Sequence, residues 1–181
     1  MLYIMRHGVT DWNREYRIQG RVDIPLNEEG RRMAAEAAVK YQDIHFDLCY
    51  CSPLKRARET AEIFFAGKDT PIIYDDRLRE MSFGICEGTQ NVFEKPDCPL
   101  YNLFQDPEHY DPPAEAESFA ELYARTGAFL EEMLPPEVTE EKCVLIIGHG
   151  AMNRSIINRI RNIPLKDYWG PIPNCELVRL I

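Results

Sequence analysis

Two histidines, each placed between an apolar run and a glycine, are the residues of this 181-residue chain with the clearest chemical potential. His7 lies in the run RHG after the apolar residues 2–5, and His149 lies in the run GHG after residues 143–147. One such histidine alone is most often a hydrogen-bonded structural residue. Two of them at the ends of equivalent strands indicate a common site, because parallel sheets bind ligands beyond the carboxyl ends of their strands. The following glycines let a ligand approach the backbone closely.

A third segment adds positive charge to the same predicted edge. Ser52 opens the run SPLKR after the predicted strand 46–51, and we predict that it caps a helix with Pro53 at the first position. The free N–H groups of that helix would favour an anion. Arg56, one turn into the helix, and Arg6, beside His7, supply guanidinium groups, which bind phosphate oxygens in pairs and keep their charge. The chain has a net charge of −9, so a cationic cluster indicates a specific ligand, and a phosphoryl group fits.

The elements that must position these residues alternate along the chain. Apolar runs predict strands, and 3.6-residue periodicity predicts helices. The predicted strands cover residues 2–5, 46–51, 71–74, 143–147 and 176–181, and the predicted helices cover residues 27–41, 52–67, 118–133 and 150–161. This order predicts an α/β fold, a three-layer α/β/α sandwich with a mostly parallel central sheet. We expect a single domain over 1–181, with the irregular, proline-rich residues 81–117 as a cap or lid over the site.

Composition excludes several classes of function. The acidic balance argues against a general nucleic-acid binder, which needs a basic surface. No apolar run approaches the ~20 residues of a membrane-spanning helix, and Arg6 interrupts the first apolar run too early for a secretory signal. We therefore expect a cytoplasmic protein without membrane or nucleic-acid partners. The six cysteines include no CxxC pair, so reduced, mostly buried thiols are expected and no metal site is predicted.

Several sequence blocks, taken together, resemble the histidine phosphatase superfamily, which includes the cofactor-dependent phosphoglycerate mutases. The similarity covers nearly the whole chain apart from residues 89–116. The blocks are RHG at 6–8, SxxxRA at 52–57 with TA at 60–61, Glu80, and GHG at 148–150, supported by Thr10, DWN at 11–13, QG at 19–20 and DxPLNxxG at 23–30.

The resemblance implies a division of labour. His7 would attack phosphorus and become phosphohistidine, and Glu80 would protonate the leaving oxygen and then deprotonate the incoming water. Arg6, Arg56 and His149 would hold the transferring oxygens, which replaces the charge of a metal ion; no cofactor is implied. These cations should help to keep His7 unprotonated. The residues implied in substrate binding are Thr10, Asn13, Gln19, Gly20 and Gly150.

Glu80 has a rival in Glu87. From spacing alone, a surface salt bridge is the expected fate of either carboxylate, and similarity to the family pattern LxE…FG…EG selects Glu80. The chain departs from the family at Val9, where many members have glutamate, and at Ala116, where many have glycine. Both positions are expected near the leaving group, so the chemistry is better defined than the substrate.

Charge favours a phosphatase over a mutase. Residues 81–118 hold one base, Lys95, against eight acids, whereas a bisphosphorylated primer would need a positive lid. We therefore predict a hydrolase of small phosphomonoesters, with homo-oligomers left open. Alternatives are a cofactor-dependent phosphoglycerate mutase and an α-ribazole-phosphate-type phosphatase, whose aromatic leaving group would suit the aromatic residues of this segment. A non-catalytic phospho-ligand-binding module is disfavoured, because nucleophile, acid and cationic ligands are all present.

The eight acids are Glu87, Glu94, Asp97, Asp106, Glu108, Asp111, Glu115 and Glu117, and the aromatic residues are Phe93, Tyr101, Phe104 and Tyr110.

Overall fold

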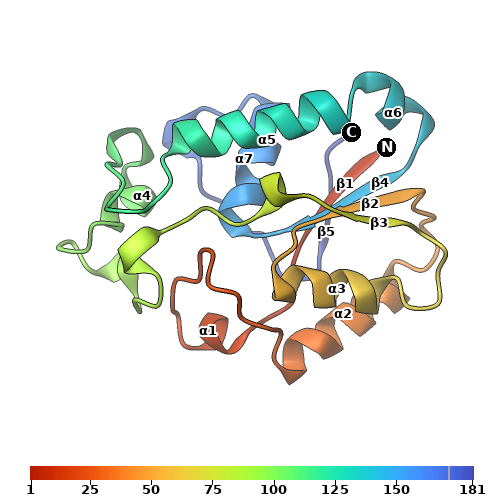
Figure 1. The fold of residues 1–181 in the computed structure, drawn as a ribbon, viewed down its shortest axis with the longest axis horizontal. Coiled ribbons are helices and arrows are strands. Elements are labelled where there is room, and N and C mark those ends of the chain that lie inside the picture. The colour runs from red at the N-terminus through yellow and green to blue at the C-terminus, as the bar shows by residue number, and fades with distance from the viewer. Residues whose placement is uncertain (171) are drawn as a thin grey trace.

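The computed structural model describes residues 1–170 and 172–181, and its centre is a mixed sheet (Figure 1). The strand order is β3-β2-β4-β1-β5. Strands β1 to β4 pair with one another in parallel, and only the edge strand β5 is antiparallel to its neighbour β1. The strands are β1 (Leu2–Arg6), β2 (Leu48–Cys51), β3 (Ile72–Tyr74), β4 (Val144–Gly148) and β5 (Leu177–Arg179).

Helices cover both faces of this sheet. In Figure 1, α5 and α7 lie on one side of the strands and α2 and α3 on the other. This arrangement confirms the predicted α/β/α sandwich. The helices are α1 (Asp11–Arg14), α2 (Glu28–Lys40), α3 (Lys55–Phe64), α4 (Tyr101–Gln105), α5 (Phe119–Met133), α6 (Pro136–Glu141) and α7 (Gly150–Arg161).

The alternating side chains of the buried strands explain the two helical layers. Ile4 of β1 packs in one apolar cluster with Leu122 of α5, whereas its neighbour Met5 packs in a second cluster with Ala34 of α2. Successive strand side chains point to opposite faces, so a continuous apolar run such as Val144–Gly148 needs a cover on each side. The sheet is therefore buried from both faces, and its polar chemistry is confined to the strand ends.

Local sequence signals correctly predicted where two of the helices begin. Asn27 caps α2 by accepting a hydrogen bond from the N–H of Gly30. Ser118 and Glu121 form the predicted capping box at the start of α5. In both cases the signal and its partner lie three residues apart, so the local sequence is enough to predict the cap.

The predicted cap at Ser52 is wrong. Helix α3 begins at Lys55, its N-cap is Leu54, and Pro53 precedes the helix. The hydroxyl of Ser52 instead lies 2.7 Å from Nε2 of His149. A partner 97 residues away thus decides the role of this serine, which no local pattern encodes.

The irregular segment 81–117 contains only short elements. They are α4 and the 3₁₀ turns Gly84–Cys86, Val92–Glu94 and Pro107–His109. The sequence did not predict α4, α1 or α6, since helices of four to six residues lack a measurable period. In Figure 1 the segment projects beyond one end of the sandwich, beside the loop that carries α1.

The prediction for the cysteines is confirmed. All six cysteines are free thiols, and five of them are buried. The side chains of His45 and His109 are exposed at the surface. Across residues 1–170 and 172–181, no helix is long and apolar enough to cross a membrane.

Candidate active site

Three strand ends meet at one edge of the sheet. Arg6 pairs with Gly148, and Cys51 pairs with Ile147, so the residues that follow β1, β2 and β4 emerge together. The imidazole rings of His7 and His149 lie with their centroids 5.1 Å apart. The sheet register therefore brings together the two predicted histidines, which are 142 positions apart in the sequence.

Hydrogen bonding fixes the tautomer of His7, whose side chain is 2% exposed. Its Nδ1 lies 2.6 Å from the carbonyl oxygen of Gly8. A carbonyl can only accept, so Nδ1 carries the hydrogen and Nε2 keeps a lone pair. Nε2 accepts a hydrogen bond from Nε of Arg56 at 3.3 Å. The ring thus presents a neutral, basic nitrogen to a guanidinium group.

Arg56 is held by backbone carbonyls and carries its charge in the interior. Its side chain donates to the carbonyl oxygens of Gly20 (2.7 Å) and Val22 (2.9 Å), and the residue is 1% exposed. Burial lowers the pKa of Arg56 to about 10, which leaves it protonated at neutral pH. Burial also lowers the pKa of Arg6, and the negative charge of nearby Glu80 opposes part of this shift. Arg6 gives the site a second cation.

These cations and the burial keep both histidines neutral. The pKa of His7 is lowered well below 6.5, first by desolvation and then by the charges of Arg56 and Arg6. The pKa of His149 is lowered for the same main reasons. The prediction that surrounding cations oppose protonation of His7 is confirmed. A neutral imidazole next to two guanidinium groups is suited to nucleophilic attack on an anionic phosphoryl group.

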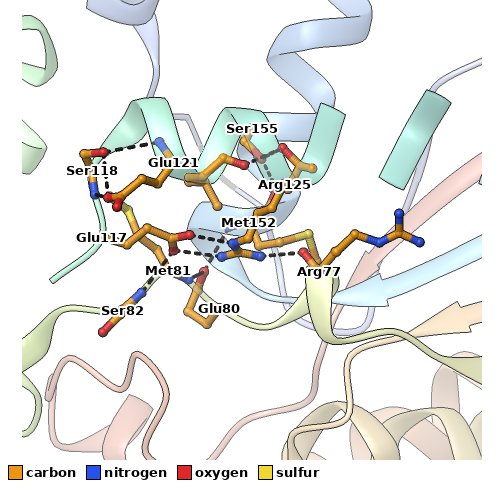
Figure 2. A network of polar contacts seen from close by, with 12 residues as sticks. Arg77, Glu80, Met81, Ser82, Glu117, Ser118, Glu121, Arg125, Met152 and Ser155 are labelled. Atoms are coloured by element: carbon orange, nitrogen blue, oxygen red, sulfur yellow. Dashed lines mark hydrogen bonds and ion pairs between the residues drawn. The ribbon is translucent and has the colours of Figure 1, made fainter. Parts of the chain in front are cut away.

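Glu80 reaches the same edge from the segment after β3. Its carboxylate, 8% exposed, accepts hydrogen bonds from the N–H groups of Met152 (2.9 Å) and Ala151 (3.2 Å) in the first turn of α7, and from Met81 (2.8 Å). Figure 2 shows Glu80 between its own loop and this helix. It therefore caps the helix N-terminus, where the dipole favours an anion, and His149 at the N-cap position forms no side-chain cap.

The rival carboxylate, Glu87, has a different task. It accepts hydrogen bonds from the N–H groups of Arg21 (2.9 Å), Val22 (3.1 Å) and Phe83 (3.1 Å). A Cβ atom on Gly20, whose φ is +54°, would lie 2.1 Å from the Glu87 carboxylate. Glu87 thus ties down the loop whose carbonyls bind the Arg56 side chain, a role set by residues more than sixty positions away.

Thr10 orients the amide side chains at the entrance. Its N–H donates to Oδ1 of Asn13 at 3.0 Å, which assigns the oxygen of that amide and leaves Nδ2 as a donor. Its hydroxyl lies 2.9 Å from Oε1 of Gln19. Asn13 and Gln19 line the cavity described next, whereas Thr10 is buried behind them.

A cavity of about 270 Å³ opens between these groups. Eight of the ten predicted site residues line it: Arg6, His7, Asn13, Gln19, Gly20, Arg56, Glu80 and Gly150. His149 and Thr10 support the lining from behind. Among the residues that the structure describes, Nε of Arg6 and Nδ1 of His149 are buried polar atoms without a hydrogen-bond partner. Such atoms are rare unless a ligand or water satisfies them.

The other half of the cavity was not predicted. Arg17, Phe83 and Trp169 line it, together with Ile18, Phe104, Ala151, Gly170 and Ile172. The rings of Phe104 and Trp169 stack with centroids 4.9 Å apart, and Trp169 donates its indole N–H to the carbonyl of Leu103. Of the predicted aromatic residues of the lid, only Phe104 lines the cavity; Tyr110 packs on Phe119 instead.

None of the eight acids of the lid lines this cavity. Asp106 pairs with His109, and Glu94 and Asp97 border a separate surface hollow. The short turns of residues 81–117 direct these side chains away from the cavity lining, which holds no basic residue of this segment either. The charged side chains that line the cavity are Arg6, Arg17, Arg56 and Glu80, and Glu87 adds a negative charge near Arg56 from outside the lining.

The sequence argument missed two supporting residues, Asn153 and Asn174, and gave a third, Ser52, the wrong role. Asn153 bridges β1 and β4 by donating to the carbonyl of Met5 (2.9 Å) and accepting from the N–H of His149 (3.1 Å). Asn174 donates to the carbonyl of His7 at 2.6 Å. Ser52 contacts His149. Only Asn153 has a local signal, since it follows His149 by one helical turn.

Comparison with known proteins identifies the family. The family model of the histidine phosphatase superfamily (branch 1) matches residues 2–181. This chain belongs to that superfamily. A protein of Schizosaccharomyces pombe named as a probable phosphatase is 35% identical over 161 residues, which are 88% of this chain and 71% of that protein. The match to the family model includes the site segments at both ends of the chain, so the resemblance stated from the sequence is confirmed.

Two further relatives bear different names. The Escherichia coli protein named as a probable phosphoglycerate mutase is 31% identical over an alignment of 193 positions, which covers 99% of this chain and 83% of that protein. The crystal structure of phosphoserine phosphatase from Entamoeba histolytica in complex with 3-phosphoglyceric acid matches with a TM-score of 0.83 and 25% identity, over 97% of this chain and 87% of that one. The family is therefore one of phosphatases and mutases.

The buried neutral histidines lead to a first prediction, about stability. Below pH 6.5, His7 and His149 become protonated in the unfolded chain but stay neutral in the folded protein, because folding lowers their pKa values. The free energy of unfolding should therefore fall as the pH falls. The expected slope is about 1.4 kcal/mol per pH unit for each histidine, until the lowered pKa is reached. Denaturant unfolding at pH 7.5, 6.0 and 5.0 in phosphate-free buffer measures it.

The matched control is His7→Gln, which should remove about half of that slope. His109, whose pKa is raised by Asp106, contributes with the opposite sign in both proteins, so the difference between them isolates His7. An unchanged slope in His7→Gln would contradict the prediction.

Proposed function

We propose that this histidine phosphatase hydrolyses small phosphomonoesters through a phosphohistidine formed at Nε2 of His7. The observation that supports it most directly is the pairing of that nitrogen with the Arg56 guanidinium 3.3 Å away, inside a cavity that ends on Arg6 and Glu80. Nε2 forms a bond to phosphorus as the ester oxygen leaves, and Glu80 gives that oxygen a proton. Water then attacks the phosphohistidine, Glu80 accepts its proton, and phosphate is released.

The cationic side chains of the cavity are suited to bind the oxygens of the phosphoryl group. Arg6 and Arg56 supply forked donors, and the donor amides of Asn13 and Gln19 stand at the entrance. His149, neutral and beside His7, has Nδ1 unsatisfied within the described residues. Charge that develops on the transferring group therefore meets preorganised donors, which is the main requirement of phosphoryl transfer.

The unpredicted half of the cavity supports a leaving group that is apolar or aromatic. Phe83, Phe104 and Trp169 line this half, and aromatic faces bind flat rings by stacking. We propose aryl or other apolar phosphomonoesters as the preferred substrates. This class includes esters of the α-ribazole phosphate type.

A phosphoglycerate mutase remains the second candidate, favoured by Arg17 as a third cation in the cavity. That guanidinium is already engaged by Glu15 at 2.5 Å and by the carbonyl of Gly88 at 3.0 Å. A bisphosphorylated primer would need further cations at its second phosphate, and no other lines the described cavity. Hydrolysis is thus the better supported outcome.

Release of inorganic phosphate from a panel of esters tests the proposal. Naphthyl and phenyl phosphates should give kcat/KM values at least about tenfold above that of 3-phosphoglycerate, because each buried ring contributes apolar contact that a carboxylate lacks. Mutase turnover, assayed with 2,3-bisphosphoglycerate as primer, should stay below hydrolysis. Dominant mutase turnover would overturn the proposal in favour of the second candidate.

We also expect activity without a divalent metal ion. The positive charge at the site comes from Arg6 and Arg56, and no cluster of three or more His, Cys, Asp or Glu side chains suited to a metal occurs within the described ranges. Dialysis against a chelator should leave the hydrolysis rate unchanged within about twofold, whereas vanadate should inhibit by imitating the five-coordinate phosphorus. A loss that Mg²⁺ or Zn²⁺ restores would refute this expectation.

A further inference from the structure

A buried ion pair lies directly behind Glu80 (Figure 2). Arg125 of α5 binds Glu117 with two parallel contacts, Nε to Oε1 at 2.6 Å and Nη2 to Oε2 at 2.9 Å. The exposed fractions of the two side chains are 16% and 7%. Neither residue lines the cavity, so neither can touch a substrate there.

Each member of the pair also holds the backbone on one side of Glu80. Nη1 of Arg125 donates to the carbonyl of Arg77, three positions before it. Oε2 of Glu117 accepts from the N–H of Ser82, two positions after it, at 3.3 Å, and the N–H of Glu117 donates to the Ser82 carbonyl at 2.9 Å. The segment from 77 to 82 is thus clamped at both ends by one ion pair.

The clamp matters because regular structure holds little of this segment. Between β3 and Glu80 lies only the 3₁₀ turn Asp76–Leu78, and between Glu80 and α4 lie only the 3₁₀ turns Gly84–Cys86 and Val92–Glu94. The Glu80 carboxylate accepts hydrogen bonds from three backbone N–H groups. The position of the Glu80 backbone, however, depends on contacts with residues outside the segment. Arg21 adds one such contact, from its Nε to the Glu80 carbonyl at 3.4 Å, and itself approaches Glu117 at 3.6 Å.

We infer that the Glu117–Arg125 pair is a positioning device for Glu80, fixing the carboxylate at the distance from which it protonates the leaving oxygen. The inference rests on the proposed function. Glu117 and Arg125 are positioning residues, because they act through Glu80. Arginine is needed for its planar fork, which engages Glu117 and the Arg77 carbonyl together, and lysine cannot reproduce that geometry.

The leaving group provides a readout that distinguishes positioning from general damage. An alkyl alcohol is a poor leaving group and needs the proton, whereas 4-nitrophenolate leaves without one. Loss of a general acid should therefore slow alkyl phosphates selectively. We compare kcat/KM, which reports steps up to the transfer of the phosphoryl group, for an alkyl phosphomonoester and for 4-nitrophenyl phosphate.

Arg125→Met should lower kcat/KM for the alkyl ester about 100-fold, the typical effect of misplacing a catalytic group by 1 Å. For 4-nitrophenyl phosphate the loss should stay within about threefold, because the nucleophile and cations are untouched. Arg125→Lys should recover only part of the alkyl rate. Glu117→Gln, which keeps the shape and still accepts from Arg125, should show the same selectivity with a smaller loss, and it remains informative if the methionine variant unfolds.

Two controls make the outcome decisive. Glu131→Gln breaks the pair of Glu131 on α5 with Arg159 on α7, away from Glu80, and should leave both esters unaffected. Glu80→Gln should show the full leaving-group selectivity, and adding Arg125→Met to it should change little further, because the two residues act through one carboxylate.

Each result has a distinct meaning. Equal losses for both esters in Arg125→Met and Glu117→Gln, or effects additive with Glu80→Gln, would overturn the positioning role and leave the proposed function intact. If Glu80→Gln itself slowed both esters equally, the assignment of Glu80 as the acid would fall, and the positioning role with it.

Discussion

Replacement of His7 by alanine is expected to abolish phosphomonoester hydrolysis, with a fall in kcat of at least about 10⁴-fold. The variant removes Nε2, the unprotonated ring nitrogen whose lone pair faces Arg56, and leaves no other nucleophile at this place in the cavity. His149 cannot replace it, because its Nε2 is engaged by the hydroxyl of Ser52. The cations and Glu80 stay in place, so substrate should still bind.

A trapped phosphoenzyme provides the direct measurement. Brief exposure to labelled substrate, followed by quenching at high pH, should retain a base-stable and acid-labile phosphoryl group on the native protein and none on His7→Ala. His45→Ala, which alters an exposed histidine outside the site, is the matched control and should label like the native protein. An acid-stable adduct, or normal labelling of His7→Ala, would disprove the assignment.

The pH dependence of the rate follows from the same environment. The lowered pKa of His7 means that the nucleophile stays unprotonated as pH falls through 6.5. The acid limb of kcat/KM should therefore appear below 6.5, with activity lost only as pH falls through the lowered value.

How much of this site was predictable from the sequence depends on the distance between interacting residues. The run of residues 143–147 indicated a buried strand, and RHG and GHG after such runs placed two histidines at the strand ends. These deductions needed only local pattern and the rule that parallel strands end at one edge. The capping box of α5 was predictable for the same local reason.

The unpredicted features depend on partners far away in the sequence. Ser52 looked like a helix cap and instead binds His149. Glu87 looked like a second acid and instead holds the loop around Gly20. Trp169 and Phe104 meet across the cavity from segments 65 positions apart. Residue type could not reveal these pairings, because each is set by how irregular loops pack after the sheet has formed.

Two variants should separate the contributions of the charge and of the shape of Arg56 to the rate. Arg56→Lys keeps a positive charge but loses the fork that spans His7, Gly20 and Val22. Arg56→Met loses both. We expect kcat/KM to fall about 100-fold for lysine and about 10⁴-fold for methionine, since a positioned cation on a transferring phosphoryl group contributes 10³- to 10⁵-fold.

The pKa of His7 is the second observable, and it moves differently in the two variants. The charge of Arg56 is one of the causes that lower this pKa. In Arg56→Met it should rise toward 6.5, because a like charge is removed, whereas in Arg56→Lys it should stay lowered. Ring-proton NMR titration between pH 4 and 8 follows both. A methionine variant with an unchanged His7 titration would mean that burial alone keeps the nucleophile neutral. Arg56 would then act only on the phosphoryl oxygens, and its 3.3 Å contact with Nε2 would have no part in preparing the attack.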